Sequence, residues 1–98
     1  MYALREEGMS FVNIGFGNIV NMQKVIAVVN PDAAPIKRMV QTAKEEQRVV
    51  DATQGRKTKA VLVMENQQIV LSAMQPETIA KRHGAVSASK NEEEGRGT

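Results

Sequence analysis

The sequence contains no cysteine, no tryptophan and a single histidine, His83. The absence of cysteine excludes disulfide scaffolds, thiolate metal sites and cysteine nucleophiles. A lone histidine at the edge of a polar tail has no set of partners for holding a metal or for acid–base catalysis. We therefore expect no metal site, no cofactor, no catalytic residue and no enzymatic activity.

Long hydrophobic runs are also missing. No apolar stretch approaches the ~20 residues that a membrane-spanning helix needs, and residues 1–10 lack the charged and apolar regions of a signal peptide. We expect a cytoplasmic protein with no membrane partner and no small-molecule substrate.

Aromatic side chains are scarce, since Tyr2, Phe11 and Phe16 are the whole set. A chain of 98 residues forms at most one domain, and its core would consist almost entirely of Val, Ile, Ala and Met. Domains near this size are only marginally stable alone, and joining several copies is a common remedy. The composition therefore favours a homo-oligomer.

The net charge of +2 is distributed unevenly along the chain. Residues 11–83 hold ten Lys and Arg against six Asp and Glu, a net +4, whereas each end contributes −1. Residues 84–98 are small, polar and charged, so we predict a disordered tail there, and a flexible extension over residues 1–10. Between them, residues 11–83 form one domain that is suited to binding a polyanion.

The hydrophobic pattern of this domain predicts an α+β fold with the element order β-β-α-β-β-β-α. Apolar runs of strand length are separated by turn residues, and the run at 24–29 is continuous enough for a strand covered on both faces. Short connections predict hairpins around 54–57 and around 65–67. The expected strands are 11–15, 24–29, 49–53, 58–64 and 68–73.

Two helices complete this prediction. The longer one starts at a cap on Asp32, has Pro35 in its first turn and ends near Arg48. Its apolar residues recur at helical spacing, which packs one stripe onto a small, largely antiparallel sheet of about five strands. The shorter helix covers residues 76–83. The apolar stripe consists of Ile36, Met39, Val40 and Ala43.

The segment NIGFGNIV, residues 13–20, contains the pair Gly15 and Gly17. A dinucleotide loop needs a third glycine where Val20 stands and a helix directly afterwards, and a P-loop needs Gly-Lys-Ser/Thr. Neither pattern is present. We interpret the two glycines as a structural bend, with Phe16 supplying a large apolar contact.

The segment TQGRKTK places Arg56, Lys57 and Lys59 at and just beyond an expected hairpin tip, where side chains project. Alternation directs Lys57 and Lys59 to one face and Thr58 to the other. Three cations on one projection suit contact with phosphates, and a solubilising turn is the alternative.

A second basic stripe follows the long helix on the side away from its apolar residues. Its cations are Lys37, Lys44 and Arg48. Such a stripe is more often a solvated helix face than a surface that enters a nucleic-acid groove.

Four motifs together resemble the RemA family of small bacterial regulators, which are named for activating genes of the biofilm extracellular matrix. The resemblance runs from about Phe11 to Arg82. In order, the motifs are NIGFGNIV, AAPIKRM, DATQGRKTKAV and IVLSAMQPETIA.

The resemblance implies a non-enzymatic, nucleoid-associated transcriptional regulator that forms a ring-like homo-oligomer and binds double-stranded DNA of promoter regions. It assigns DNA contacts to Lys24, Arg56, Lys57 and Lys59, and makes Gly15, Phe16, Gly17 and Pro35 structural turns or subunit contacts.

Some positions depart from the family pattern. Arginines are usual at the positions of Lys24, Lys57 and Lys59, and an aromatic residue is common at that of Gln54. Lysine keeps the charge but loses the planar fork, so contacts with the DNA backbone survive better than base reading. Two other functions stay open, an oligomeric scaffold that binds a protein and an RNA-binding protein.

Overall fold

The α+β class and the predicted element order are confirmed, with one additional short strand, β2. The computed structural model describes residues 10–86, so the expected N-terminal extension and most of the expected tail lie outside the described residues. The elements are β1 (Phe11–Asn13), β2 (Ile19–Asn21), the 3₁₀ turn η1 (Met22–Lys24), β3 (Val25–Val29), α2 (Ala34–Glu45), β4 (Val49–Asp51), β5 (Ala60–Met64), β6 (Ile69–Ser72) and α3 (Pro76–Val86).

The strands form two sheets instead of one. Strands β1 and β2 make an antiparallel hairpin, and the other four form a sheet in the order β3-β5-β6-β4. Within that sheet β3, β5 and β6 are antiparallel neighbours, whereas β4 lies parallel to β6. The predicted hairpin between β5 and β6 is therefore confirmed.

The predicted hairpin around 54–57 is wrong, because β6 lies between β4 and β5. Residues 52–59 instead cross the end of β6. The amide of Ala52 donates to the carbonyl of Leu71 at 2.9 Å, and that of Lys59 donates to the carbonyl of Ser72 at 2.8 Å. Adjacent strands lie only about 4.8 Å apart, so eight residues bridge two strand spacings easily.

The glycine segment forms the β1–β2 turn, which the sequence interpretation described only as a bend. The amide of Ile14 donates to the carbonyl of Asn18 at 2.8 Å, and the amide of Asn18 donates to that of Gly15 at 3.0 Å. Three consecutive residues have positive φ: 114° at Gly15, 55° at Phe16 and 79° at Gly17. A glycine on each side lets the chain reverse within this short connection.

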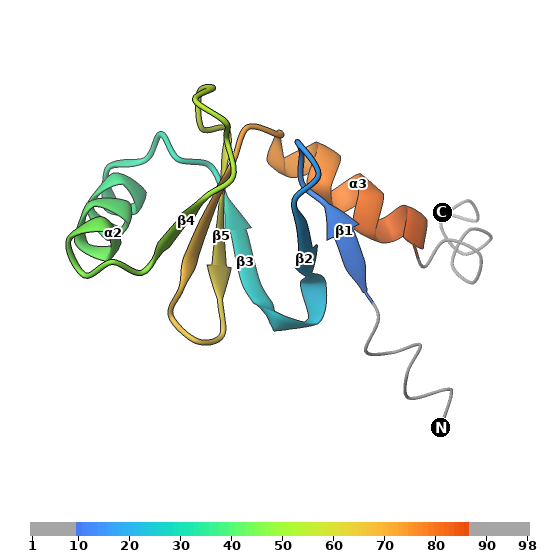
Figure 1. The fold of residues 1–98 in the computed structure, drawn as a ribbon, viewed down its shortest axis with the longest axis horizontal. Coiled ribbons are helices and arrows are strands. Elements are labelled where there is room, and N and C mark those ends of the chain that lie inside the picture. Colours follow the sequence, from blue (N-terminus) through green and yellow to red (C-terminus); the bar gives the residue numbers. More distant parts are fainter. Residues whose placement is uncertain (1–9, 87–98) are drawn as a thin grey trace.

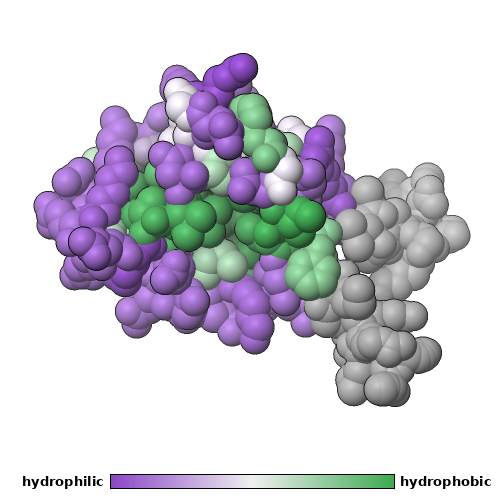
Figure 2. Space-filling view, in the orientation of Figure 1, coloured by the Kyte–Doolittle hydropathy of each residue, from purple (hydrophilic) through white to green (hydrophobic). Residues whose placement is uncertain are grey.

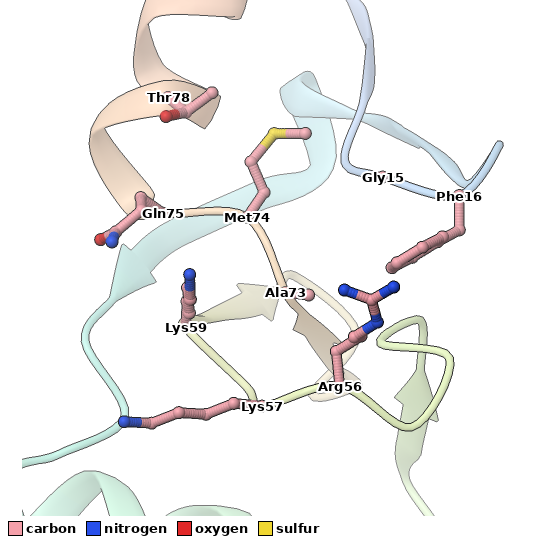
Figure 3. Close-up of a pocket in the computed structure, with 9 residues that line it drawn as sticks. All are labelled: Gly15, Phe16, Arg56, Lys57, Lys59, Ala73, Met74, Gln75 and Thr78. Atoms are coloured by element: carbon pink, nitrogen blue, oxygen red, sulfur yellow. The ribbon is translucent and has the colours of Figure 1, made fainter.

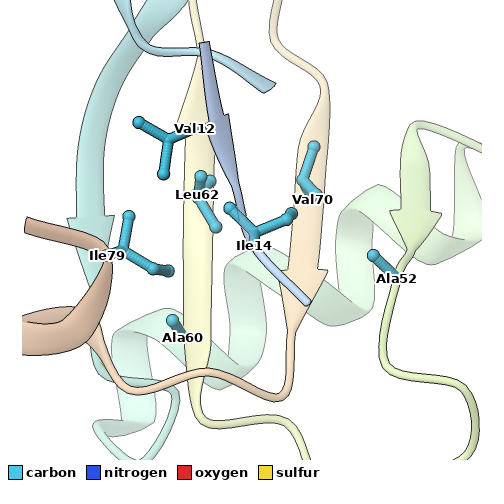
Figure 4. Close-up of a cluster of buried hydrophobic side chains, with 7 residues drawn as sticks. All are labelled: Val12, Ile14, Ala52, Ala60, Leu62, Val70 and Ile79. Carbon is cyan, nitrogen blue, oxygen red and sulfur yellow. The ribbon is translucent and has the colours of Figure 1, made fainter. Parts of the chain in front are cut away.

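Helix α2 covers one face of the four-stranded sheet, while the β1–β2 hairpin and α3 cover the other (Figure 1). Alternate residues of the central strands point into two separate apolar layers. On the hairpin side, drawn in Figure 4, the buried residues are Val12, Ile14, Ala52, Ala60, Leu62, Val70 and Ile79. On the α2 side they are Ala43, Val61, Ile69 and Leu71, against which the predicted stripe of α2 packs.

The start and the end of α2 differ in detail from the prediction. The N-cap residue is Ala33, which provides no side-chain cap, so the predicted cap on Asp32 is wrong. The backbone amide of Asp32 instead donates a hydrogen bond to the side-chain oxygen of Asn30 at 2.8 Å. Pro35 lies in the first turn, as predicted. The helix ends at Glu45, because Gln47 takes φ 59° and closes the last turn.

Two other predictions need correction. Strand β3 is an edge strand and is not covered on both faces, since Ile26 beside its bulge is 67% exposed. Helix α3 continues past the predicted end at His83, so residues 84–86 of the expected tail are helical. No helix within residues 10–86 is long and apolar enough to cross a membrane.

Candidate nucleic-acid interface

Residues 52–59, here called the basic loop, have a defined shape. Between Thr53 and Arg56 the chain makes a tight turn, in which the Arg56 amide donates to the Thr53 carbonyl at 2.9 Å. Both central residues have positive φ, 53° at Gln54 and 78° at Gly55, as in a type I′ turn. Gln54 and Gly55 therefore form the tip of the loop, and Arg56 follows directly after it.

Asp51 anchors the start of the basic loop. Its Oδ1 accepts two hydrogen bonds from Thr53, one from the hydroxyl at 2.6 Å and one from the amide at 2.9 Å. These bonds, with a smaller contribution from the charge of Lys44, hold the pKa of Asp51 below its ordinary value of 3.8. The carboxylate is thus ionised whenever the loop has this conformation near neutral pH.

The basic loop, the glycine turn and the segment between β6 and α3 border an open surface cavity of about 610 Å³ (Figure 3). We call it the loop cavity. The cations of the basic loop lie on one side and apolar side chains on the other. Its lining consists of Gly15, Phe16, Arg56, Lys57, Lys59, Ala73, Met74, Gln75 and Thr78.

Ser72 ties these segments together, and the sequence interpretation missed its role. Its fully buried hydroxyl donates to the carbonyl of Ile14 at 2.7 Å and accepts from the amide of Met74 at 3.0 Å. The hydroxyl therefore links the glycine turn to the floor of the loop cavity. A serine that ends an apolar strand is the available signal, but it does not identify a partner 58 residues away.

Among residues 10–86, no acidic residue lines the loop cavity. Within residues 10–86, ion pairs join Lys24 to Glu65 and Arg48 to Glu46, and none involves the cations of the basic loop. The Arg56 guanidinium carbon lies 5.8 Å from the centre of the Phe16 ring, within the range of a cation–π contact. The cavity therefore has a concentrated positive potential.

The predicted alternation along residues 57–59 is confirmed, although these residues precede β5. Lys57 and Lys59 line the loop cavity, whereas Thr58 turns toward a smaller cavity of about 210 Å³ against α2. Lys37 and Lys44 line that smaller cavity as well. Part of the second basic stripe therefore flanks the basic loop.

Two predicted cations lie elsewhere. Lys24 is at the opposite end of β5 from Lys59, where its Nζ is 3.7 Å from a carboxylate oxygen of Glu65. Arg48 lies at that same end, where it pairs with Glu46 at 2.7 Å and donates to the carbonyl of Gln67. The structure thus does not bring Lys24 and Arg48 together with the basic loop.

The four predicted structural positions also separate. Gly15 and Phe16 line the loop cavity, and Gly17 completes the turn above it. Phe16 is 50% exposed and belongs to neither buried cluster. Its ring faces the Arg56 guanidinium instead of the core. Pro35 lies on α2, across the sheet. Among residues 10–86, no three potential metal ligands come together.

These features describe a small α+β domain that presents an acid-free cationic cavity at one end, and similar chains are known as regulatory proteins. The chain belongs to the RemA-like family, described as extracellular matrix regulatory protein A-like, whose family model matches residues 11–83. This membership confirms the predicted resemblance and supports a regulatory role.

Three relatives illustrate the similarity, and each is named provisionally as a regulatory protein. One from Lachnoclostridium phytofermentans is 66% identical over 71 residues, which cover 72% of this chain and 78% of the relative. One from Bacillus cytotoxicus is 58% identical over 74 residues, covering 76% and 85%. One from Geobacillus sp. strain WCH70 is 51% identical over 75 residues, covering 76% and 86%.

Proposed function

We propose that the protein is a non-enzymatic transcriptional regulator that binds double-stranded DNA of promoter regions as a ring-like homo-oligomer. The genes it controls are those of the biofilm extracellular matrix, and its place is with the nucleoid in the cytoplasm. The observation that carries the proposal is the basic loop, on which Arg56, Lys57 and Lys59 face one acid-free hollow.

The chemistry of the loop fits a phosphate backbone. Arg56 presents a planar fork that can hold two phosphate oxygens, and the two lysines add mobile charges beside it. The side chains of all three residues are exposed, whereas the strands behind the loop are paired in the four-stranded sheet. A duplex that rests on this end of the molecule would meet cations without displacing any ion pair.

One subunit supplies too few contacts for tight binding. Three or four phosphate contacts correspond to weak non-specific association, in the ~10⁻⁴–10⁻⁶ M range. Repetition around a ring makes later contacts intramolecular and raises avidity by roughly 10²–10⁴. Lys24, at the other end of β5, would serve as an outlying contact, while Lys37 and Lys44 would widen the positive surface beside the loop.

Exposed apolar side chains support self-association. Figure 2 shows a band of apolar residues across the middle of one face, over the strands between α2 and β1. The large exposed apolar residues belong to the β1–β2 hairpin and to β3 and β4, the two edge strands of the four-stranded sheet. Different surfaces of neighbouring subunits can therefore contact each other head to tail, and head-to-tail contacts are the kind that close rings. The exposed apolar residues are Phe11, Phe16, Ile19, Ile26 and Val50.

Arg56→Ala tests the DNA interface. We expect the variant to bind a promoter duplex at least about tenfold more weakly than the wild type, because one phosphate contact per engaged subunit is lost. For the same reason, the slope of log K against log salt should become less negative by at least about 1. Fluorescence anisotropy with a labelled duplex measures both quantities, and light scattering checks that assembly is intact.

Arg38→Ala is the matched control, since Arg38 is an exposed arginine of α2 that lines neither cavity. It should bind DNA as the wild type does. If Arg56→Ala bound the duplex as tightly as the wild type, or if the affinity of the wild type for DNA did not change with salt, the proposal would be contradicted. Preference for structured RNA over duplex DNA in competition would favour the RNA-binding alternative, and absence of binding to either would favour a scaffold.

A further inference from the structure

We propose that the loop cavity is a binding site for a nucleoside diphosphate, which competes with DNA for Arg56, Lys57 and Lys59. The competition rests on the proposed DNA-binding function, whereas nucleotide binding itself does not. A cavity that joins a cationic side to an apolar side suits a ligand with both characters.

The size of the cavity fits this ligand class. Its volume of about 610 Å³ lies within the ~300–1,000 Å³ typical of small-molecule sites. Three separate chain segments form its walls, and the buried Ser72 hydroxyl fixes two of them relative to each other. The backbone of these two walls is therefore held in place, which lowers the entropic cost of binding.

The charge of the cavity fits a diphosphate. A nucleoside diphosphate carries about three negative charges near neutral pH, because the second ionisation of a terminal phosphate has a pKa of about 6. Three cations line the cavity, and no carboxylate within residues 10–86 does. Gln75 and Thr78 add polar side chains at the start of α3, whose first turn also carries Glu77.

The apolar side of the cavity fits a nucleobase. The Phe16 ring points toward Arg56 (Figure 3), and Met74, which packs against the hairpin-side core, lines the cavity as well. Aromatic rings and arginine planes are the usual stacking partners of an unpaired base. A duplex keeps its bases stacked inside, so its backbone has no part that would occupy this apolar wall.

Because both ligands require the same cations, the nucleotide should displace DNA. Coupling between two ligands is reciprocal, so DNA must weaken nucleotide binding by the same factor. The cavity would thereby make DNA affinity responsive to the concentration of a nucleotide.

The test is calorimetry with the full chain and three probes: ADP, inorganic pyrophosphate and adenosine. We expect ADP to bind at least about tenfold more tightly than pyrophosphate, because its base adds a stacking contact that pyrophosphate lacks. Adenosine alone should bind weakest. Absence of ADP binding at concentrations up to about 5 mM would overturn the proposal, since that limit corresponds to a negligible affinity.

Two variants separate the parts of the site. Phe16→Ala should reduce ADP affinity about five- to tenfold and leave pyrophosphate binding unchanged, and Phe16→Leu should be intermediate. Phe16 is half exposed and outside the core, so these variants should fold, which circular dichroism checks. Unchanged ADP affinity in Phe16→Ala, or equal affinity for ADP and pyrophosphate, would overturn the base-stacking site.

DNA binding is measured separately, without nucleotide. Binding of ADP together with failure to bind DNA would contradict the proposed function and leave the nucleotide site standing. Binding of DNA without ADP binding would do the reverse. ADP that binds but does not displace the labelled duplex would overturn the shared use of Arg56, Lys57 and Lys59.

Discussion

Ser72 shows how one buried hydroxyl holds a surface site together. It satisfies the Ile14 carbonyl and the Met74 amide at the same time. Because neither group has another partner among the contacts described for it, the buried Ile14 carbonyl and the part-buried Met74 amide both depend on this side chain for a hydrogen bond. The position of the glycine turn over the loop cavity therefore depends on a buried residue that is not part of the cavity lining.

Ser72→Ala should lower the free energy of unfolding by about 1–3 kcal/mol, because two buried polar groups lose their partner. Urea denaturation followed by circular dichroism measures this. Ser10→Ala is the control. Ser10 is less buried and accepts a hydrogen bond from Met22 through its backbone carbonyl, which the substitution keeps, so the free energy of unfolding should change little. A Ser72→Ala variant as stable as the wild type would contradict the role of the hydroxyl.

Asp51 gives the basic loop a dependence on pH. Since its pKa is lower in the folded protein than the ordinary 3.8, its bonds to Thr53 stabilise the fold fully above that value, and the contribution is lost as the pH falls through the lowered pKa. The carboxylate is exposed, so we expect Asp51→Asn to cost under about 1 kcal/mol at pH 7.

Denaturation of wild type and Asp51→Asn at pH 7 and near pH 3 checks this expectation. The difference between the two proteins should shrink as the medium becomes more acidic. A difference that stays constant or grows on acidification would show that the Asp51 carboxylate does not anchor the loop.

At the scale of elements, the glycine turn is an arrangement of backbone conformations that most residues avoid. A Cβ atom at Gly17 would meet no other atom within 4 Å, so the cost of a side chain there comes from its φ of 79° alone. Gly17→Ala should therefore destabilise the protein by about 1–2 kcal/mol, and Gly17→Asn by less, because Asn tolerates this region better.

Gly84→Ala is the matched control for that experiment. Gly84 also has open space around it but lies in α3 with helical backbone, where alanine is favoured by up to about 1 kcal/mol. Thermal unfolding should thus shift in opposite directions for the two glycines. A Gly17→Ala variant as stable as the wild type would mean that the turn relaxes into another conformation.

The sequence predicted the elements well and their pairing less well. Periodicity located α2, α3 and the strands β3 to β6, because each strand or helix must bury one apolar side. Strand β2 was missed since Ile19 and Val20 follow the glycines too closely to look like a separate run. The parallel pairing of β4 with β6 was missed because short connections favour hairpins, and no local signal shows that a third strand will enter between two others.

The candidate site was predicted in part for the same reason. Arg56, Lys57 and Lys59 are close in sequence, so alternation sufficed to place them on one side. Lys24 was grouped with them by resemblance, although the geometry of β5 separates it. The cavity itself needs Met74 and Phe16, which come from distant segments, and tertiary structure alone brings these together.

At the scale of the whole molecule, the exposed edge of β3 is the strongest candidate for a subunit contact. Ile26 is 67% exposed at a bulge, and an unpaired strand edge with apolar side chains tends to bind another chain. Ile26→Lys should leave the monomer folded, and the mass of the assembly measured by light scattering should fall toward that of the monomer. Thr42→Lys, on the exposed side of α2, is the control and should keep the wild-type mass. A wild-type that is already monomeric would contradict the ring.

The crossing of residues 52–59 over β6 also makes the arrangement of Arg56, Lys57 and Lys59 depend on β6. The loop is held at both ends by Leu71 and Ser72, which are synthesised after it. The cations of the basic loop therefore reach their common side of the cavity only after β6 has formed, so the charge pattern of the loop depends on the folding of a later segment of the chain.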